Sequence, residues 1–309
     1  MKTRAPILLF VYNRPVHTRR TLESLSRNAG ADQSDLFIFS DGPKSPEEEA
    51  TIGAVRKIIS EKYPFRSITI QEEPVNKGLA RSVIDGITQI IKREGKAIVL
   101  EDDIMTSPHF LSFINAALDA HAANKSVFSV TGYCYPFTLP PDYTADTYLA
   151  YRSCSWGWAT WSDRWELADW ELRDFDTFSK DKGMQQGFNR AGADLSYMLK
   201  SYHQKRIDSW AIRWAYTHFL HQGLCLYPVR PMVSNTGMDG SGTHYVKKNP
   251  LLETAIEPGF EPKMVETLPA LSAGINKNIY QLLDPGWLKK LFYRYKYDLR
   301  PAIRSFFHI

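Results

Sequence analysis

Four short apolar segments in the first hundred residues constrain the fold of this chain most strongly. They are PILLFVY (6–12), DLFIF (35–39), RSITI (66–70) and AIVL (97–100), and each is followed by a stretch with helical periodicity. In the segment 77–93, Leu, Val and Ile recur at the spacing of an amphipathic helix. Strands that alternate with helices in this way predict an α/β fold with a mixed, mostly parallel sheet flanked by helices.

The composition supports a globular enzyme-sized protein and argues against a nucleic-acid partner. The chain has 309 residues, of which 43% are hydrophobic, enough for the core of one large α/β domain or two modest ones. Its 38 basic and 34 acidic residues are nearly balanced. Because binding to a phosphate backbone needs a strong excess of positive charge, we predict no nucleic acid among its partners.

Cysteine content and hydropathy predict a cytoplasmic protein. Cys134, Cys154 and Cys225 are odd in number and lack the spacing of metal ligands, so neither a disulfide framework nor a structural zinc site is expected. The apolar run near the N-terminus leads into Asn13-Arg14-Pro15 without a small-residue cleavage site, which indicates a first strand and not a signal peptide. No window reaches the roughly 18 apolar residues that would span a bilayer.

Polar side chains follow three of the four predicted strands. Asn13-Arg14 follows the first strand, Ser40-Asp41-Gly42 the second, and Glu101-Asp102-Asp103 the fourth. In an open α/β sheet the ligand binds in the crevice beyond the carboxyl ends of the strands. These three segments are therefore expected to face one ligand site.

The run of three acids at 101–103 has two interpretations. Two like charges about 4 Å apart repel by roughly 4 kcal/mol at an effective dielectric of about 20, and a divalent cation such as Mn²⁺ or Mg²⁺ would offset that cost. Alternatively, the acids could form a favourable cluster at the N-terminus of a following helix that begins at Pro108, with Ser107 as its N-cap.

The second half of the chain has a different pattern. Five of the eight tryptophans lie within residues 152–170, which predicts an aromatic wall or platform. A helix is expected from Asp208 to about Gln222, followed by a strand, LCLYPV, and by the glycine-rich segment SNTGMDGSGTHY, which is typical of a loop.

The last segment, residues 287–309, combines six Lys or Arg with seven aromatic residues and a single Asp. Mixed cations and aromatic rings suit the surface of an anionic membrane, which would place the protein peripherally on the inner face of the plasma membrane. The alternative is a C-terminal helix that docks on the domain with its charges facing water.

Several of these motifs occur together, in the same order, in a known family. The chain resembles nucleotide-sugar glycosyltransferases of the GT-A fold, especially the N-acetylglucosaminyltransferase I type and bacterial family 2 glycosyltransferases. The resemblance covers about residues 5–245 and is carried by these motifs: PILLFVYNRP, Ser40-Asp41, NKGLARSVIDGI, VLEDD followed by SPHFLSFI, YRSCSWGWATW and VSNTGMDGSGTHY.

The resemblance implies a Rossmann-like GT-A domain at residues 1–250 with a C-terminal helical extension at 251–309. Within the domain, about 1–132 would form the nucleotide-sugar-binding half and about 133–250 the acceptor-binding half.

The resemblance also assigns roles to the donor-site residues. Asp103 matches the acid that binds Mn²⁺ (or Mg²⁺) beneath the donor diphosphate, and Glu101 and Asp102 would contact the sugar, ribose or base. The other matching positions, which surround the nucleotide, are Asn13, Arg14, Asp41, Lys77, Gly78 and Arg81. Among them, Asp41 is suited to accept a hydrogen bond from uracil, and Lys77, Gly78 and Arg81 would close over the phosphates. An exposed helix position is the alternative for Arg81.

Transfer with inversion needs a base that takes the proton of the acceptor hydroxyl. Asp208 matches the position of the catalytic carboxylate in the family, although relatives can carry two adjacent acids where Ser209 follows here; its alternative role is the N-cap of its helix. Trp156-Gly157-Trp158 resembles an aromatic turn near donor sugar and acceptor, with core packing as the alternative. His244 could reach the metal or phosphates.

Three functions fit the sequence. The first is an inverting, metal-dependent glycosyltransferase that moves a sugar, with GlcNAc favoured by the resemblance, from a UDP-sugar to a glycan or lipid-linked acceptor in surface polysaccharide or lipopolysaccharide synthesis. The second is a sugar-nucleotide nucleotidyltransferase, disfavoured because the N-terminus lacks a glycine-rich triphosphate-binding segment. The third is a non-enzymatic glycan-binding module, supported only by the tryptophan-rich segment.

Overall fold

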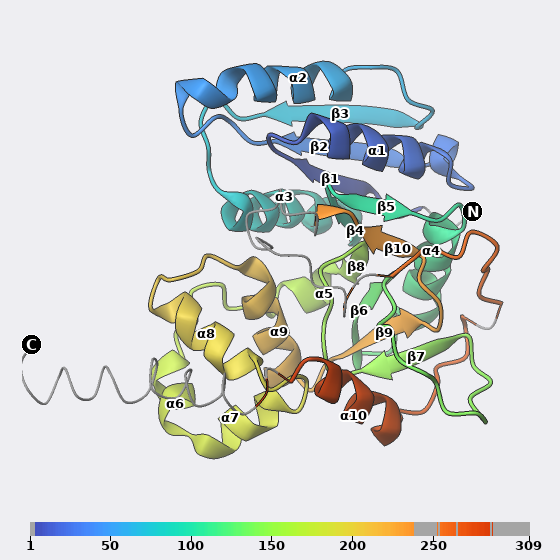
Figure 1. Ribbon diagram of the computed structural model, residues 1–309, viewed down its shortest axis with the longest axis vertical. Helices are drawn as coiled ribbons and strands as arrows, with labels where there is room; N and C mark the ends of the chain where they lie inside the picture. The colour runs from blue at the N-terminus through green and yellow to red at the C-terminus, as the bar shows by residue number, and fades with distance from the viewer. Residues whose placement is uncertain (1–3, 238–251, 253, 264, 285, 287–309) are drawn as a thin grey trace, which may run out of the picture.

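The protein is built on one eight-stranded mixed sheet (Figure 1). The computed structural model describes residues 4–237, 252, 254–263, 265–284 and 286. The strand order is β3-β2-β1-β4-β8-β6-β9-β7. β8 pairs antiparallel with both β4 and β6, and β7 pairs antiparallel with β9, whereas the other neighbouring strands are parallel. The predicted mixed, mostly parallel α/β sheet is confirmed.

The first four predicted strands form one parallel half of the sheet. Their bounds are Ile7–Val11 (β1), Asp35–Ser40 (β2), Ser67–Glu72 (β3) and Lys96–Glu101 (β4). The helices between them are Pro15–Ser26 (α1), Glu49–Ile59 (α2) and Leu79–Glu94 (α3), with short 3-10 turns at Ala31–Gln33 and Pro46–Glu48. Residues with β-branched and aromatic side chains fill these strands because such side chains pack well on a pleated surface.

A short strand separates the three acids from the next helix. β5 (Ile104–Thr106) pairs antiparallel with β10 (Val233–Asn235), and α4 (Phe110–His121) begins only after that. The prediction of a helix starting at Pro108 with Ser107 as its N-cap is wrong, because α4 has no side-chain cap and the Ser107 hydroxyl has no hydrogen-bond partner among the described residues. The acids therefore do not belong to the N-terminus of that helix.

The second half of the chain completes the sheet. β9 (Leu224–Pro228) matches the expected strand LCLYPV, and α9 (Trp210–Leu220) lies within the expected helix; β6 (Val127–Thr131) pairs with β9. β7 (Thr147–Ala150) and β8 (Trp158–Trp161) were not predicted, nor was α5 (Ser162–Trp165). The tryptophan-rich segment thus contributes a strand at the centre of the sheet, and its bulk is largely core.

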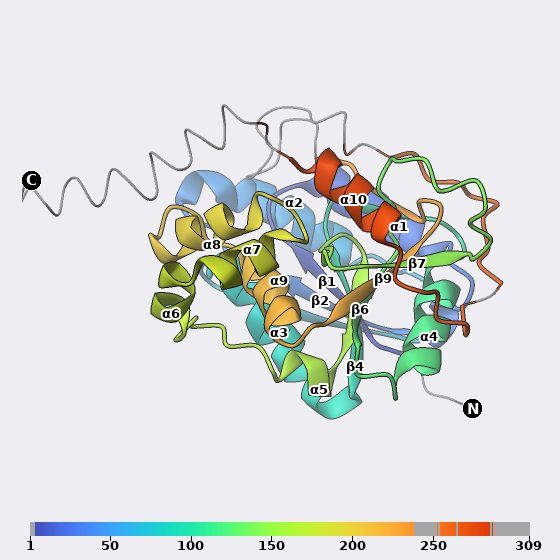
Figure 2. The same cartoon turned by 90° about the horizontal axis from the view of Figure 1, so that it is seen from below.

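Helices cover both faces of the sheet (Figures 1 and 2). Along β1, alternate residues enter different cores: Ile7 and Leu9 pack with side chains of α1, α2 and α4, whereas Leu8 and Phe10 pack with α3 and α9. This alternation follows from the two-residue period of a strand. The first core also includes residues of α10 (Ala273–Leu282), the one described helix of the predicted C-terminal extension.

Three further helices form a lobe beside α9. They are Phe175–Lys180 (α6), Lys182–Asn189 (α7) and Leu195–His203 (α8), and Phe178, Phe188 and Leu199 join residues of α9 in a separate apolar cluster. The segment that leads from α8 to α9 leaves this lobe and approaches α3 (Figure 1). The lobe therefore holds the entry to α9 in place.

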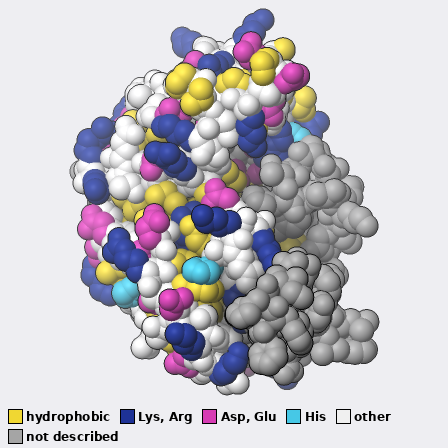
Figure 3. Space-filling view, turned by 90° about the vertical axis from the view of Figure 1, so that its left-hand side faces the viewer, with side chains coloured by type: hydrophobic (Ala, Val, Ile, Leu, Met, Phe, Trp, Pro, Cys, Tyr) yellow, Lys and Arg dark blue, Asp and Glu magenta, His cyan; other side chains and the backbone are white. Residues whose placement is uncertain are grey.

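The predicted membrane-binding tail, residues 287–309, lies outside the described residues. Within the stretches that the structure describes, no helix is long and apolar enough to cross a membrane. On the face seen in Figure 3, basic and acidic side chains are interspersed and do not separate by sign.

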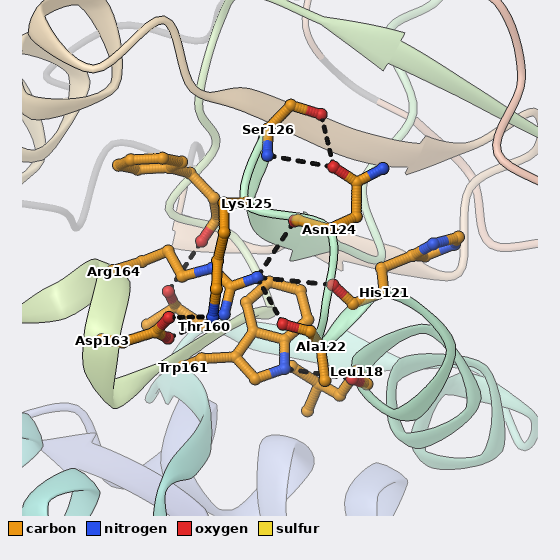
Figure 4. A network of polar contacts seen from close by, with 11 residues as sticks. Leu118, His121, Ala122, Asn124, Lys125, Ser126, Thr160, Trp161, Asp163 and Arg164 are labelled. Carbon is orange, nitrogen blue, oxygen red and sulfur yellow. Dashed lines mark hydrogen bonds and ion pairs between the residues drawn. The ribbon is translucent and has the colours of Figure 1, made fainter.

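A buried arginine ties the end of α4 to the helix that follows β8 (Figure 4). The Arg164 guanidinium donates to the backbone carbonyls of Ala122 (2.7 Å) and Asn124 (3.0 Å), and it lies 4.4 Å above the ring of Trp161. Its side chain is only 3% exposed. Because the last carbonyls of a helix have no partner within the helix, this side chain replaces the missing donors.

Replacing Arg164 with Met should lower the free energy of unfolding by about 2–3 kcal/mol, because the variant removes a buried guanidinium that donates to the carbonyls of His121, Ala122 and Asn124. The matched control is Lys125→Met. Lys125 also pairs with Asp163, but both side chains are well exposed, so we expect a change of about 1 kcal/mol or less. Urea unfolding of the three proteins measures the difference, and equal losses in the two variants would show that the carbonyl contacts contribute little.

Candidate active site

A cavity of about 460 Å³ opens where the sequence predicted a ligand crevice, beyond the carboxyl ends of β1, β2 and β4. Its walls come from these strand ends, from the start of α3 and from the segment before α9. Seven of the predicted site residues line it: Asn13, Arg14, Asp41, Gly78, Glu101, Asp102 and Asp208. The structure thus brings together residues that lie almost 200 positions apart in the sequence.

Arg14 organises the acids that follow β4. Its guanidinium pairs with the carboxylate of Asp102 and lies 2.9 Å from Oδ2 of Asp103. Burial raises the pKa of Asp102, while Arg14 acts in the opposite direction. Desolvation and the two neighbouring acids raise the pKa of Glu101 to about 8. The positive charge of Arg14 therefore offsets part of the negative charge of Asp102 and Asp103, whereas Glu101 has a strong tendency to hold a proton.

Asp103 differs from Asp102 in having an unused oxygen. Both oxygens of Asp102 are engaged, by Arg14 and by the backbone N–H of Tyr12. Asp103 is 7% exposed, and its Oδ1 has no hydrogen-bond partner among the described residues. A buried carboxylate oxygen without a donor is costly unless a cation or another donor completes it.

The segment after β10 packs directly on Asp103. Thr236 donates two hydrogen bonds to the backbone carbonyl of Asp103, from its N–H (2.8 Å) and its hydroxyl (3.0 Å). A Cβ on Gly237 would lie 2.1 Å from Asp103 Oδ2, so a larger residue there would displace the Asp103 carboxylate. Thr236 and Gly237 were not predicted as site residues, although both lie in the motif VSNTGMDGSGTHY. His244 lies outside the described residues.

The carboxylate of Asp41, which was predicted to accept a hydrogen bond from uracil, is held by the protein itself. Its carboxylate accepts four hydrogen bonds from the protein: from the N–H groups of Gly42 (2.9 Å), Lys77 (2.8 Å) and Gly78 (3.0 Å), and from the side-chain amide of Asn76 (2.9 Å). Two donors on each oxygen use its lone pairs, so none remains for a uracil N–H. Asp41 instead shapes the loop before α3.

Asp41→Asn should disturb that loop, because one of the two oxygens becomes an N–H₂ group that faces two N–H donors. We expect the free energy of unfolding to fall by about 2 kcal/mol and nucleotide affinity to fall with it. The matched control is Asp119→Asn, which weakens a single ion pair with Lys96 away from the cavity. Thermal unfolding with and without UDP would measure both effects. If Asp41→Asn kept the stability and the UDP response of the unaltered protein, Asp41 would not position the loop before α3.

Lys77, Gly78 and Arg81, at the start of α3, lie in three different environments. Gly78 lines the cavity and has φ +82°, a conformation that favours glycine. The Lys77 side chain pairs with Glu73 at 2.6 Å, so only its backbone N–H serves the site. Arg81 is 73% exposed, pairs with Asp85 at 3.5 Å and does not line the cavity, which agrees with the exposed-helix alternative.

Asp208 lines the cavity close to Gly78. Its Oδ2 lies 4.0 Å from the position that a Cβ on Gly78 would occupy, and its Oδ1 lies 3.5 Å from the buried guanidinium of Arg213. The N-cap of α9 is Ser209, whose hydroxyl accepts from the N–H of Ile212. The N-cap alternative for Asp208 is therefore wrong, and its side chain, 67% exposed, remains available to a ligand.

The two tryptophans of the aromatic turn, Trp156 and Trp158, lie in different environments. Trp158 is fully buried and packs against Trp165, Trp210 and Trp214, as the core-packing alternative stated. We therefore do not propose a contact between Trp158 and substrate. Trp156 is half-buried and lines a second, smaller cavity. Gly157 has φ +53° and places the two rings on different sides.

Several lining residues were not predicted. The phenol of Tyr12 and the amide of Asn13 both donate to Glu48, and the Lys44 ammonium lies 5.2 Å from the centre of the Tyr12 ring. Arg206 enters from the segment before α9. Tyr12 lies within the motif PILLFVYNRP, and Arg206 lies two positions before Asp208. Their closeness to a motif was the only feature of the sequence that could have identified them as site residues.

Comparison with known proteins yields distant likenesses only. No protein-family model and no curated protein matches the sequence. Among solved structures, S. aureus TarS 1–349 is 12% identical over 75% of this chain, with a TM-score of 0.43, and the chain spans 61% of that protein's length. The mannosyltransferase PcManGT from Pyrobaculum calidifontis, in complex with GDP-Man and Mn²⁺, is 16% identical over 70% of each chain, with a TM-score of 0.38. At such values, function must be argued from the site.

Proposed function

We propose that the protein is an inverting, metal-dependent glycosyltransferase of GT-A type that uses a UDP-sugar. The observation that carries the proposal is the cavity lined by Asp102, which pairs with Arg14, and by the exposed carboxylate of Asp208; Asp103 lies beside this lining and contacts the same arginine. A donor diphosphate and an acceptor hydroxyl need those two kinds of group on either side of the reacting carbon. In this proposal residues 1–132 bind the donor and 133–250 bind the acceptor.

The residues present fit a divalent cation. Oxygen ligands suit Mn²⁺ and Mg²⁺, which commonly take one or two carboxylates and complete their shell with water and substrate phosphates. The unused Oδ1 of Asp103 offers such a ligand, and the described residues contain no group of three or more His, Cys, Asp or Glu that would form a complete protein site. A cation held by Asp103 would neutralise the charge that develops on the departing diphosphate.

The protein's own groups supply the remaining chemistry. Arg14 fixes the direction of Asp102 and Asp103, and the loop shaped by Asp41 brings backbone and Gly78 against the donor. Asp208 accepts the proton from the acceptor hydroxyl as that oxygen forms its bond to the anomeric carbon. The bond from the anomeric carbon to the diphosphate breaks on the opposite side, and the UDP leaves with its negative charge.

The site favours this function over the two alternatives. A nucleotidyltransferase must bind the three phosphates of a nucleoside triphosphate, whereas each strand end here is occupied by acids or by groups that hold acids in place. A glycan-binding module would not need buried aspartates. The donor sugar, proposed as GlcNAc, the lipid-linked or glycan acceptor, and a place in surface polysaccharide synthesis at the membrane rest on the resemblance described above.

A thermal-shift screen of nucleotides and nucleotide sugars, with and without Mn²⁺, tests the proposal. A ligand that binds only the folded protein raises its stability by RT ln(1 + [L]/Kd), about 2.7 kcal/mol when its concentration is 100 times Kd. We expect UDP and a UDP-sugar to stabilise the protein strongly only when Mn²⁺ is present, with no comparable effect from UTP and a sugar phosphate. The absence of any response to uridine nucleotides would remove the proposal.

A further inference from the structure

A buried arginine lies next to the proposed base. Arg213, in α9, has a side chain that is only 8% exposed, and its Nη2 lies 3.5 Å from Oδ1 of Asp208. Within the part of the chain that the structure describes, no other carboxylate forms an ion pair with this guanidinium. Because a buried charge is costly without an opposite charge nearby, Asp208 is the group that compensates the charge of Arg213.

The protein holds the Arg213 guanidinium in place without help from Asp208. Its Nε donates to the backbone carbonyl of Ser209 (3.2 Å), and its Nη1 donates to the backbone carbonyl of Trp170 (3.0 Å). The group also lies 4.4 Å from the centre of the Tyr202 ring, which α8 supplies. A planar guanidinium can donate from its edge and stack on a ring with its face at the same time. Arg213 is therefore a fixed positive charge, held by α8, by α9 and by the segment at Trp170.

This fixed charge gives the two oxygens of Asp208 different surroundings. Oδ1 lies beside Arg213, whereas Oδ2 lies 4.0 Å from the position that a Cβ on Gly78 would occupy, in the lining of the cavity. An exposed side chain otherwise changes rotamer within nanoseconds. A general base must bring one oxygen within hydrogen-bond reach of the proton that it takes, and small misplacements slow a reaction strongly. The ion pair with Arg213 thus leaves Oδ2 as the oxygen that can meet a substrate proton.

We propose that Arg213 is a positioning residue, which holds the carboxylate of Asp208 in the orientation in which Oδ2 takes the proton of the attacking hydroxyl. The inference rests on the proposed glycosyltransferase function, which makes Asp208 the base. Arg213 does not line the cavity, so it acts through Asp208 and not through a contact with substrate. Loss of Arg213 should consequently lower turnover and leave donor binding unchanged.

The probe reaction for the test is Mn²⁺-dependent hydrolysis of UDP-GlcNAc by the full chain, in which water replaces the acceptor hydroxyl and gives its proton to the same base. Arg213→Met should lower kcat about tenfold, because Asp208 loses the charge that orients it. The KM for UDP-GlcNAc and the rise in Tm that UDP gives should stay unchanged. The matched control is Arg164→Met, which also removes a buried guanidinium from backbone carbonyls and an aromatic ring. Arg164 does not line the cavity, so this control should keep its kcat.

A double-mutant cycle separates positioning of the base from a general structural defect. If Arg213 acts through Asp208, Arg213→Met should change kcat by less than about twofold in the Asp208→Asn background, whereas the effects of independent sites combine in full. Arg213→Lys keeps a cation but not the planar fork. It should show the same pattern with a loss of about threefold, and it replaces the methionine variant if that variant does not fold.

Normal turnover of the Arg213 variants, or an equal loss with and without Asp208→Asn, would overturn the inference. Either result would leave the proposed function standing as long as UDP still stabilises the protein with Mn²⁺. Absence of that UDP response in the unaltered protein would instead overturn the proposed function, and this inference with it.

Discussion

Asp208→Asn should slow sugar transfer by about a thousandfold while the protein keeps its fold and its affinity for UDP. General base catalysis contributes roughly 10²–10⁴ to the rate, and an amide at this position cannot accept the proton of the acceptor hydroxyl. Folding should be unaffected, because Ser209 and not Asp208 caps α9 and because the Asp208 side chain is 67% exposed. Initial rates of UDP release with and without acceptor, together with a UDP thermal shift, measure the three quantities.

The matched control for this prediction is Asp85→Asn. Asp85 is also an exposed acid paired with an arginine, but it lies on the outer surface of α3 and does not line the cavity. It should transfer sugar at the normal rate. If Asp208→Asn retained most of its activity, Asp208 would not be the base.

The parts of the fold that the sequence predicted share a simple local signal. β1 to β4 were predicted from short apolar runs, each followed by a segment with helical periodicity, and the three polar strand ends followed from sheet topology. β8 shows why other elements were missed. It lies between β4 and β6 with all four residues buried, as in β1, but its two tryptophans resembled a binding surface more than an apolar strand.

The sequence predicted most residues of the candidate site, but it did not predict the hydrogen bonds that these residues make with one another. Asp41 and Asp103 were both expected to meet ligand, yet four protein donors use the Asp41 carboxylate whereas one oxygen of Asp103 lacks any described donor. Such differences depend on the loop at 76–78, which donates to Asp41, and on the packing of Gly237 against Asp103, which lies 134 residues earlier in the chain. Spacing along the chain holds no information on hydrogen bonds formed across such distances.

Asp103→Asn should abolish the stabilisation that UDP gives in the presence of Mn²⁺. The substitution preserves shape, so Arg14 and the segment at Thr236 can keep most of their contacts, but the amide is a poor ligand for a hard divalent cation. With UDP at about 100 times Kd, the unaltered protein should gain about 2.7 kcal/mol, which corresponds to roughly 5 °C in Tm. The variant should gain almost nothing.

Glu101→Gln is the comparison that separates metal binding from charge. Glu101 lines the same cavity, and desolvation together with the two neighbouring acids raises its pKa to about 8 in the metal-free protein, so the neutral amide preserves the form that Glu101 favours in that state. We expect this variant to keep most of the Mn²⁺-dependent UDP shift. Titration of Mn²⁺ at fixed UDP distinguishes the variants, because only Asp103→Asn should fail to saturate. An Asp103 variant that saturates at the normal Mn²⁺ concentration would show that the cation is held by other residues.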